Sequence, residues 1–375
     1  MLTPLSLIKQ QHKQYLFSWT INIARITLKI VLLFSQLCFL LYKDKSNYVY
    51  NIDEIEKALA CQLVIDKPDL CRTITISETS PSSGSTTTTS KINYTGTIDL
   101  LVLVNSAVGN FAARSAIRDT WAAYLRTEHV PVYFLLASTN NTIYQSLIEQ
   151  EDHTNQDILQ LSHIIDSYRN LTLKSVAMLH LIASRCSHAK MVLKVDDDVL
   201  LNAPALLNFV RTTNCTGTFF GRLAHRWIPV LEPGQKNYCP QLVCYTGLTY
   251  PDFVIGPAYL FDSRLAEPIL DYTIQHINSV IYIEDVYITG IVAQELNIPR
   301  YRLFHHEIFP PSNRCEFRLS VVWTTLHAVE IRNGWQAANT ITEKCSGDIT
   351  NLTDSYYDPL ICSKGRDKFE KIVKY

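Results

Sequence analysis

The chain has 375 residues, of which 47% are apolar and 18% charged, and its formal net charge is -1 at pH 7. This length accommodates one large domain or two modest ones, and the composition is that of a globular protein. The near-zero charge argues against a dedicated nucleic-acid-binding protein, whose surface is usually basic. Ten cysteines occur without a Cys-x-x-Cys pair or a His-x-x-x-His partner, so we expect disulfides formed in an oxidising compartment rather than a zinc site.

Residues 26–42 form a nearly uninterrupted apolar run that predicts a membrane span. Lys29 is its one charged residue, and about 17 residues is the short end of what crosses a bilayer. A cleaved signal peptide is the alternative, but the run starts late and no small-x-small cleavage site follows it. Trp19 and Tyr42 suit interfacial anchors, and the basic residues ahead of the run favour a cytoplasmic tail at 1–25.

Residues 43–96 are interpreted as a stem on the lumenal side. Its residues 80–90 are Ser, Thr, Pro and Gly, which have no apolar periodicity and cannot build a core. We expect Cys61 and Cys71 to close a small loop there or to link two chains. An apolar span this short suits the thinner membranes of the early secretory pathway.

Five Asn-x-Ser/Thr triplets also indicate passage through the secretory pathway. At Asn170 a glycan is not expected, because Thr172 opens a predicted helix in a segment that looks packed. Glycans are expected at the other four sites, which are Asn93, Asn140, Asn214 and Asn351.

Apolar runs and helical periodicity predict an α/β domain after the stem. Ile98 to Val104 and Val130 to Ala137 are short runs typical of strands buried on both faces, and Arg114 to Tyr124 between them suits a helix. The order strand, helix, strand implies a βαβ unit. A second apolar helix face starts at Leu173 and includes His180, interpreted as a core histidine, and residues 190–195 form a third strand.

The third strand runs directly into Asp196, Asp197 and Asp198. Adjacent carboxylates repel one another, and burial raises their pKa unless a cation compensates. A hard divalent cation with oxygen ligands does so and can bridge to phosphate oxygens. Ligands of open α/β sheets bind at the carboxyl ends of strands, where this triplet lies. The alternative is a solvated turn in which Asp198 caps a helix.

A second acidic pair, Glu284 and Asp285, follows the apolar stretch Val280 to Ile283 and precedes residues 286–296, which have helical character. One interpretation is a general base that deprotonates an acceptor hydroxyl. The alternative is capping, because acidic residues are favoured at a helix N-terminus.

Five segments follow one another along the chain: Arg114–Trp121, Asp166–Lys174, Lys194–Val199, Tyr250–Pro251 with Gly256 and Tyr259, and Glu284–Tyr287. Their residues and order resemble those of the β1,3-galactosyltransferases and their relatives in glycosyltransferase family 31. The resemblance covers roughly Thr97 to Trp335, so residues 97–375 are interpreted as the catalytic domain. It implies a GT-A-type fold, a UDP-sugar donor, Mn²⁺, inversion at the anomeric carbon and a type II Golgi membrane topology.

The same resemblance implies roles for individual residues. Asp285 is the base, and Glu284 positions the acceptor or the base. Asp198 and Asp196 are metal ligands, and Tyr250 and Gly256 lie on the acceptor side. The donor-binding residues are Arg114, Arg118, Asp196 and Asp197, although a surface pair is the alternative for the two arginines.

The sequence departs from the family pattern in two places. Trp323 stands where many relatives have a metal-ligating histidine, so either His327 or His305 substitutes, or carboxylates, water and diphosphate hold the metal. Residues 252–255 differ from the acceptor loop of vertebrate relatives, so the acceptor does not transfer.

We therefore expect transfer of a hexose, galactose first, from a UDP-sugar to a glycan on protein or lipid in β1,3 linkage. UDP-N-acetylglucosamine as donor is the alternative within the family, and a catalytically silent lectin or chaperone is the alternative outside it.

Nine cysteines beyond the span are an odd number, which leaves one free or available for a homodimer. A Cys186–Cys215 bridge is expected because the two flank the Asp triplet.

Overall fold

The computed structural model describes residues 49–71, 74–77, 91–94, 98–240, 243–303, 306–307, 320–324 and 326–339, with the single positions 311, 315 and 317. The predicted tail at 1–25 and span at 26–42, together with His305 and Asn351, lie outside these residues. Within the described residues, no helix has the length and apolar character needed to cross a bilayer.

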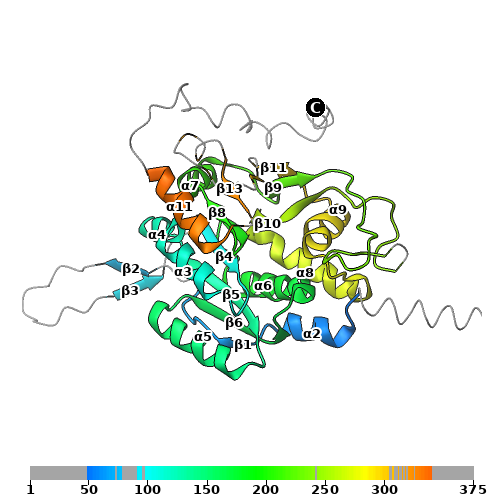
Figure 1. The fold of residues 1–375 in the computed structure, drawn as a ribbon, viewed down its shortest axis with the longest axis horizontal. Helices are drawn as coiled ribbons and strands as arrows, with labels where there is room; N and C mark the ends of the chain where they lie inside the picture. Colours follow the sequence, from blue (N-terminus) through cyan, green and yellow to red (C-terminus); the bar gives the residue numbers. More distant parts are fainter. Residues whose placement is uncertain are drawn as a thin grey trace, which may run out of the picture.

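An eight-stranded mixed sheet runs through the centre of the domain (Figure 1). Four neighbouring strands are parallel, and the strands on either side bring antiparallel pairs, so the α/β prediction is confirmed at the level of a mixed, largely parallel sheet. In spatial order the strands are β1 (Leu63–Ile65), β6 (Ile158–Ile165), β5 (Val132–Ser138), β4 (Leu100–Asn105), β7 (Met191–Asp196), β10 (Phe253–Asp262), β9 (Phe219–Ala224) and β11 (Arg300–Arg302).

Helices cover both faces of this sheet, and alternate residues of β4 show how the two faces divide. Leu101 and Leu103 belong to one buried cluster, and Leu100, Val102 and Val104 belong to the other. Against the first face pack α2 (Ile52–Ala60), α6 (Leu171–Arg185), α8 (Ala266–Gln275) and the π-helix η4 (Val286–Val292), which continues into α9 (Ala293–Glu295). Against the second pack α3 (Phe111–Asp119), α4 (Trp121–Thr127), α5 (Thr142–Asn155), α7 (Ala203–Thr212) and α11 (Ala328–Asn339).

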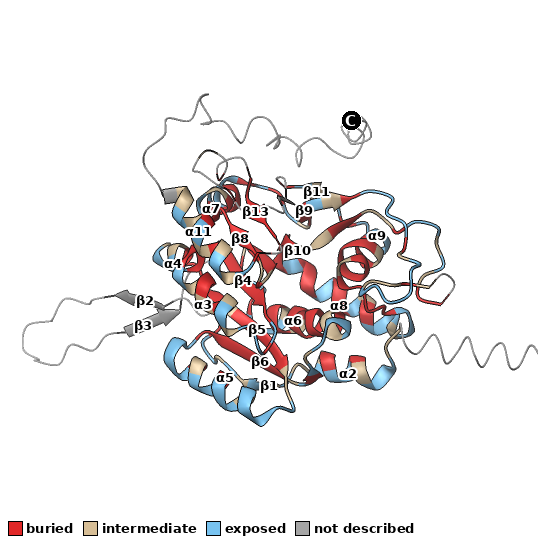
Figure 2. Ribbon diagram, in the orientation of Figure 1, coloured by how far each residue is buried: buried red, intermediate tan, exposed pale blue. Residues whose placement is uncertain are grey.

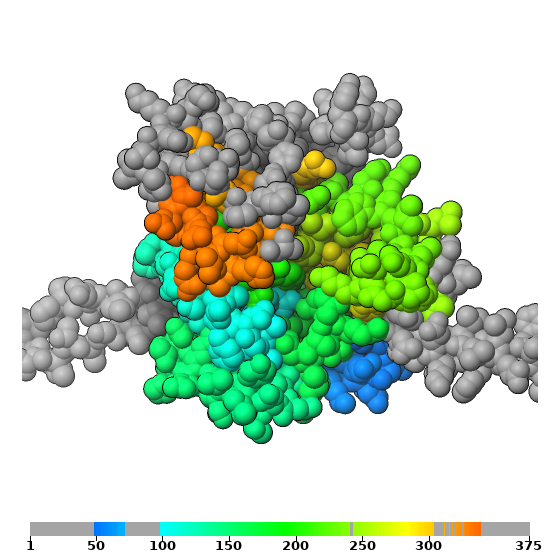
Figure 3. Space-filling model, in the orientation of Figure 1, coloured from blue at the N-terminus to red at the C-terminus, as the bar shows by residue number. Residues whose placement is uncertain are grey.

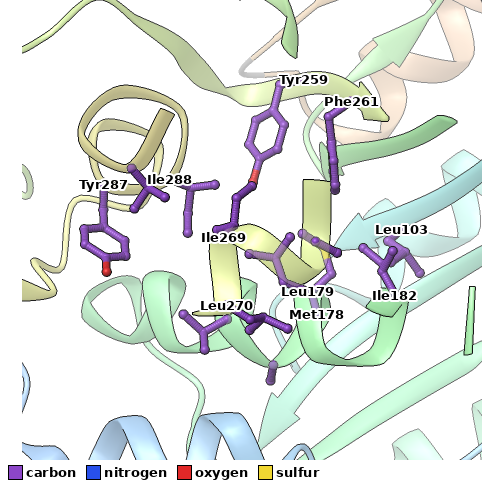
Figure 4. Close-up of a cluster of buried hydrophobic side chains, with 14 of the residues drawn as sticks. Leu103, Met178, Leu179, Ile182, Tyr259, Phe261, Ile269, Leu270, Tyr287 and Ile288 are labelled. Atoms are coloured by element: carbon purple, nitrogen blue, oxygen red, sulfur yellow. The ribbon is translucent and has the colours of Figure 1, made fainter. Parts of the chain in front are cut away.

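Burial follows this layering, since the sheet and the inner faces of the helices are buried while outer faces such as that of α5 are exposed (Figure 2). In the first cluster, Met178, Leu179 and Ile182 of α6 lie among residues of α8, β10 and η4 (Figure 4).

Smaller elements are the sheet β12 (His306–Glu307), β13 (Val322–Trp323) and β8 (Leu200–Leu201), the pair β2 (Ile74–Ser77) and β3 (Lys91–Tyr94), and the 3-10 turns η1 (Tyr168–Asn170), η2 (Ser263–Leu265) and η3 (Ile277–Ser279).

Part of the segment interpreted as a stem belongs to the folded domain. Helix α2 opens with a capping box between Asn51 and Glu54 and buries Ile55 and Ala58 in the first cluster, and β1 pairs with β6. Burial of this amphipathic helix face stabilises the docking. Residues 49–71 are therefore part of the domain, and the predicted boundary at 97 is too late for them.

The disulfides differ from the predicted pairs. Cys71 is bonded to Cys186, which ties the segment after β1 to the end of α6, and Cys61 is free. The expected Cys61–Cys71 loop and the expected Cys186–Cys215 bridge are therefore both wrong. Cys215 is itself disulfide-bonded, as is Cys315, and Cys239 pairs with Cys244.

Two predicted helices also differ in form. The helix expected from Arg114 to Tyr124 breaks at Thr120, where φ and ψ are −122° and −115°, and gives α3 and α4. The helix expected after Asp285 begins as a π-helix, a form that occurs frequently at functional sites. His180 is half-buried on α6 rather than a core residue.

Candidate active site

The predicted site residues gather at the carboxyl ends of the adjacent strands β4 and β7. Asn105, the last residue of β4, pairs in register with Asp196, the last residue of β7. Antiparallel β10 adds Gly256 to this edge through hydrogen bonds to Lys194 and to Asp285. The edge thus combines both acidic groups that the sequence singled out, although they lie far apart in the chain.

Asp197 holds the turn between β4 and α3. Its buried Oδ2 accepts hydrogen bonds from Ser106 Oγ at 2.6 Å, Asn110 Nδ2 at 3.0 Å and the backbone N–H of Ala107 at 3.2 Å. Hydrogen bonds from three donors satisfy a buried carboxylate without a metal ion. Asp197 therefore shapes the turn between β4 and α3, and its direct contact with a donor stays a prediction.

Arg114 and Arg118 do not form an open donor-binding surface. Arg114 is fully buried and donates to Glu151 and to the carbonyl of Ala107 at 2.7 Å. Arg118 makes a double hydrogen bond to Asp157 at 2.8 Å and a third to Glu151 at 2.6 Å. The surface-pair alternative is therefore wrong, because both guanidinium groups pair with mostly buried carboxylates and hold the turn and α3 against α5. Their contact with a nucleotide stays a prediction.

Sequence reasoning assigned no role to Lys174 and Asp166, although their motif was recognised. Lys174 is buried, donates to the carbonyl of Ser106 at 2.7 Å, and has its Nζ 4.0 Å from Asp166 Oδ1. Desolvation lowers the pKa of Lys174 to about 8, and the carboxylates of Asp166 and Asp197 oppose that shift. Asp166 accepts from the backbone N–H of Val108 at 2.9 Å, so this motif fixes the same turn.

A chain of hydrogen bonds joins Asp196 to Asp285. The buried ammonium of Lys194 donates to Asp196 Oδ1 at 2.6 Å and to the Gly256 carbonyl at 2.7 Å. The Gly256 N–H then donates to Asp285 Oδ2 at 2.8 Å. Burial raises the pKa of Asp196 to about 7, opposed by Lys194, and burial together with the negative charge of Glu284 raises the pKa of Asp285 to about 6. A carboxylate tuned toward neutrality is suited to proton transfer.

Glu284 is buried and oriented by two hydroxyl groups. Its Oε1 accepts from Tyr259 at 2.6 Å and from Ser175 at 2.7 Å. Asp285 is half-buried and is the N-cap of η4, where its Oδ1 accepts from the Val286 N–H at 2.9 Å. Asp285 therefore caps η4, as the alternative predicted, and its predicted role as a base is compatible with that position. In addition to burial, the charge of Glu284 raises the pKa of Asp285.

The metal ligands are incomplete within the described chain. Asp198 is half-buried, and its pKa is raised by burial and by the charge of Asp197. Among the residues that the structure describes, no group of three or more His, Cys, Asp or Glu side chains could hold a metal ion. Trp323 is buried and stacked on Phe317 with ring centroids 5.0 Å apart, and His327 is exposed.

Tyr250, which was predicted to lie on the acceptor side, is buried, and its hydroxyl is unpartnered among the described residues. Tyr250 packs its ring on Tyr245 and Phe253, with centroids 5.2 and 6.2 Å away. Its hydroxyl has no hydrogen-bond partner among the described residues, and the same holds for Oδ1 of buried Asn105. Burial raises the pKa of Tyr250, and the charges of Tyr282 and Asp285 add to the rise.

The glycosylation sites fall into three groups. Asn140 and Asn214 are exposed. Asn170 is half-buried, donates to the carbonyl of Ile165 at 2.8 Å, and is followed by a fully buried Thr172. For Asn93, in β3, the side chain lies outside the described residues.

In the space-filling view, α11 (orange) lies beside α3 (cyan), the helix that follows β4 (Figure 3). Arg332 of α11 donates to Asp119 at 2.6 Å and to Ser115 at 2.9 Å. This contact anchors the C-terminal described helix to the helix that follows β4.

Comparison with known proteins identifies the family. The sequence profile described as galactosyltransferase matches residues 112–303, which is half of the chain and includes every acidic residue of the site. The chain belongs to the galactosyltransferase family. Among its relatives is the human lactosylceramide 1,3-N-acetyl-beta-D-glucosaminyltransferase, 30% identical over 53% of this chain and 54% of the relative. Another is beta-1,3-galactosyltransferase 5 of Pan paniscus, 29% identical over 64% of this chain and 80% of the relative.

This galactosyltransferase-family chain spans about half the length of the first of these relatives. Among solved structures, a glycosyltransferase involved in the glycosylation of the major capsid of PBCV-1 is similar over 63% of this chain and 98% of that one, with a TM-score of 0.34 and 7% identity. A score this low supports no argument about the site.

Proposed function

We propose that the protein is an inverting β1,3-hexosyltransferase that uses a UDP-sugar donor, galactose first, and a glycan hydroxyl as acceptor. The observation that carries the proposal is the hydrogen-bonded chain from Asp196 through Lys194 and Gly256 to Asp285. It holds the proposed base, Asp285, at the same sheet edge as the turn between β4 and α3. The GT-A assignment of the fold is part of this proposal.

The reaction is a single displacement. The acceptor oxygen attacks the anomeric carbon, the bond from that carbon to the diphosphate breaks, and UDP leaves with the electron pair. Asp285 takes the acceptor proton, because its carboxylate has a raised pKa and is held by two backbone N–H groups. One base is sufficient here, whereas a glycosidase needs a second carboxyl group as acid. Glu284, held by Tyr259 and Ser175, positions Asp285 and the acceptor.

Mn²⁺ is the proposed ion, with Asp198 and Asp196 as its protein ligands. A bound divalent ion would neutralise charge on the leaving diphosphate. Because a hard cation takes about six ligands, two carboxylates leave most of its shell to donor oxygens and water. We therefore expect donor and Mn²⁺ to bind with positive coupling, each tightening the other by the same factor.

The alternative donor is UDP-N-acetylglucosamine, since the relatives include enzymes named for each sugar. A catalytically silent lectin or chaperone with the same fold is the alternative of a different class. We further propose a Golgi location with the domain in the lumen, a type II anchor at 26–42, and glycans at the exposed Asn140 and Asn214.

Release of UDP during incubation with a panel of donors and acceptors tests the function. Asp285→Asn should lower turnover by roughly 10²- to 10⁴-fold, as expected for loss of a general base, and leave UDP binding nearly unchanged. More than about a tenth of normal turnover in this variant would remove Asp285 from the mechanism. If none of the donors in the panel releases UDP although the protein binds UDP, the catalytically silent lectin or chaperone would be favoured.

A further inference from the structure

The segment that connects β9 to β10, residues 225–252, carries an exposed lysine, Lys236. The ammonium of Lys236 lies 5.0 Å from the ring centroid of Tyr168, a cation–π distance. Tyr168 belongs to η1, directly before α6, and so lies in the Asp166–Lys174 motif, whose end residues hold the turn between β4 and α3. Lys236 therefore lies beside the Asp166–Lys174 motif, which fixes the turn between β4 and α3.

The backbone at Lys236 is fixed by hydrogen bonds from Tyr282. Buried Tyr282, two residues before Glu284, donates its hydroxyl to the carbonyls of Tyr238 at 2.6 Å and Lys236 at 3.3 Å. The Cys239 N–H also donates to the carbonyl of Val230 at 2.8 Å, and Cys239 is bonded to Cys244. The anchored backbone therefore fixes where the Lys236 side chain begins, while the exposed side chain keeps its rotamer freedom.

The positive charge of Lys236 acts on Asp198 and is not neutralised by an ion pair in the described chain. Its positive charge acts to lower the pKa of Asp198, against the larger effect of burial. Tyr168, under its ammonium, has a pKa raised by burial and by the charges of Asp285 and Asp196. Within the described chain, the Lys236 ammonium has no carboxylate ion-pair partner, whereas Lys194 is engaged by Asp196 and the Gly256 carbonyl.

We propose that Lys236 binds the diphosphate of the nucleotide-sugar donor and stabilises the charge that develops on the departing nucleotide. The inference rests on the proposed function and adds a residue to it. As the bond between the anomeric carbon and the diphosphate oxygen breaks, the electron pair stays on that oxygen and the acceptor proton goes to Asp285. Lys236 remains protonated and supplies positive charge where Asp198 and Asp196 provide only part of a cation shell.

The test compares Lys236→Met, which keeps the apolar stem over Tyr168, with Lys236→Arg, which keeps the charge. Lys57→Met on α2 is the matched control, because it removes an exposed positive charge away from the site. Calorimetry measures binding of UDP and of uridine to each full-length protein without added metal and with Mn²⁺. Turnover is measured in parallel as UDP release, and thermal unfolding verifies the fold of each variant.

We expect Lys236→Met to weaken UDP binding by about 10- to 100-fold, as for loss of a charged hydrogen bond, and to leave uridine binding unchanged. Its turnover should fall by about 10²-fold, and Lys236→Arg should restore most of both. UDP affinity equal to that of the Lys57→Met control overturns the inference, as does equal weakening of uridine and UDP. If the unsubstituted protein transfers no sugar but Lys236→Met selectively loses UDP binding, the inference is supported and the proposed function is rejected. Normal transfer by Lys236→Met rejects only the inference.

Discussion

The backbone N–H of Gly256 donates a hydrogen bond of 2.8 Å to Oδ2 of Asp285. The carbonyl of the same residue accepts from Lys194, so a single residue of β10 orients the proposed base and the lysine that pairs with Asp196. A side chain at this position would project against the base, because an added Cβ would lie 3.3 Å from Asp285 Oδ2 and 3.6 Å from its Cβ.

Gly256→Ala should therefore lower turnover without preventing UDP binding. The neighbouring carboxylate must move by a few tenths of an ångström, and we expect about a tenfold loss, since a 1 Å error in position costs about 10²-fold. Single-turnover kinetics in a double-mutant cycle with Asp285→Asn measures the coupling. A loss of the same size in both backgrounds would show that Gly256 acts elsewhere.

The pH profile should report the base. Asp285 must be deprotonated to accept a proton, and its pKa is raised to about 6, so kcat/KM should fall about tenfold per pH unit below pH 6 and level off above it. Glu284 contributes to the raised pKa by repulsion after burial, while Lys194 opposes it. Glu284→Gln should shift the acid limb of the profile to lower pH. A shift to higher pH, or none, would contradict this assignment.

The strands of the domain were predictable because their apolar runs are local properties. The predicted strands Ile98 to Val104 and Val130 to Ala137 agree with β4 and β5 to within two residues at each end. Residues 49–71 were missed, since α2 is a short amphipathic helix whose partners on α6 lie more than 100 residues away. Its stability comes from tertiary packing, which no short window of sequence contains.

The sequence predicted which residues belong to the site better than it predicted what each of them contacts. The motif pattern singled out Arg114 and Asp197, but both interact with protein groups and not with open solvent. Whether a guanidinium is free depends on Glu151, which is 37 residues distant on α5. Lys236 carries no local signal at all, because its position depends on the fixed course of the segment between β9 and β10.

The two disulfides with known partners should differ in their effect on stability. Cys71–Cys186 closes a loop with a sequence separation of 115 residues, and Cys239–Cys244 one of 5. By loop-closure entropy the first should contribute about 5 kcal/mol and the second about 2 kcal/mol. Cys71→Ser with Cys186→Ser should therefore lower the free energy of unfolding more than Cys239→Ser with Cys244→Ser, as measured in guanidinium chloride. The reverse order would argue against docking of residues 49–71.

The last prediction separates a structural role of the arginines from nucleotide contact. Arg118 pairs with Glu151 and Asp157, whose side chains are 10% and 5% exposed. Breaking a buried pair leaves uncompensated charge, so Arg118→Met should lower the free energy of unfolding by about 3 kcal/mol, even though Arg126 still contacts Asp157 at 2.6 Å. Arg332→Met, which removes the exposed pair with Asp119, should cost at most about 1 kcal/mol. Denaturant unfolding with and without UDP distinguishes the two roles. Unchanged stability with a selective loss of UDP affinity in Arg118→Met would support the nucleotide contact, whereas lost stability with UDP affinity retained in the folded fraction assigns Arg118 to the scaffold.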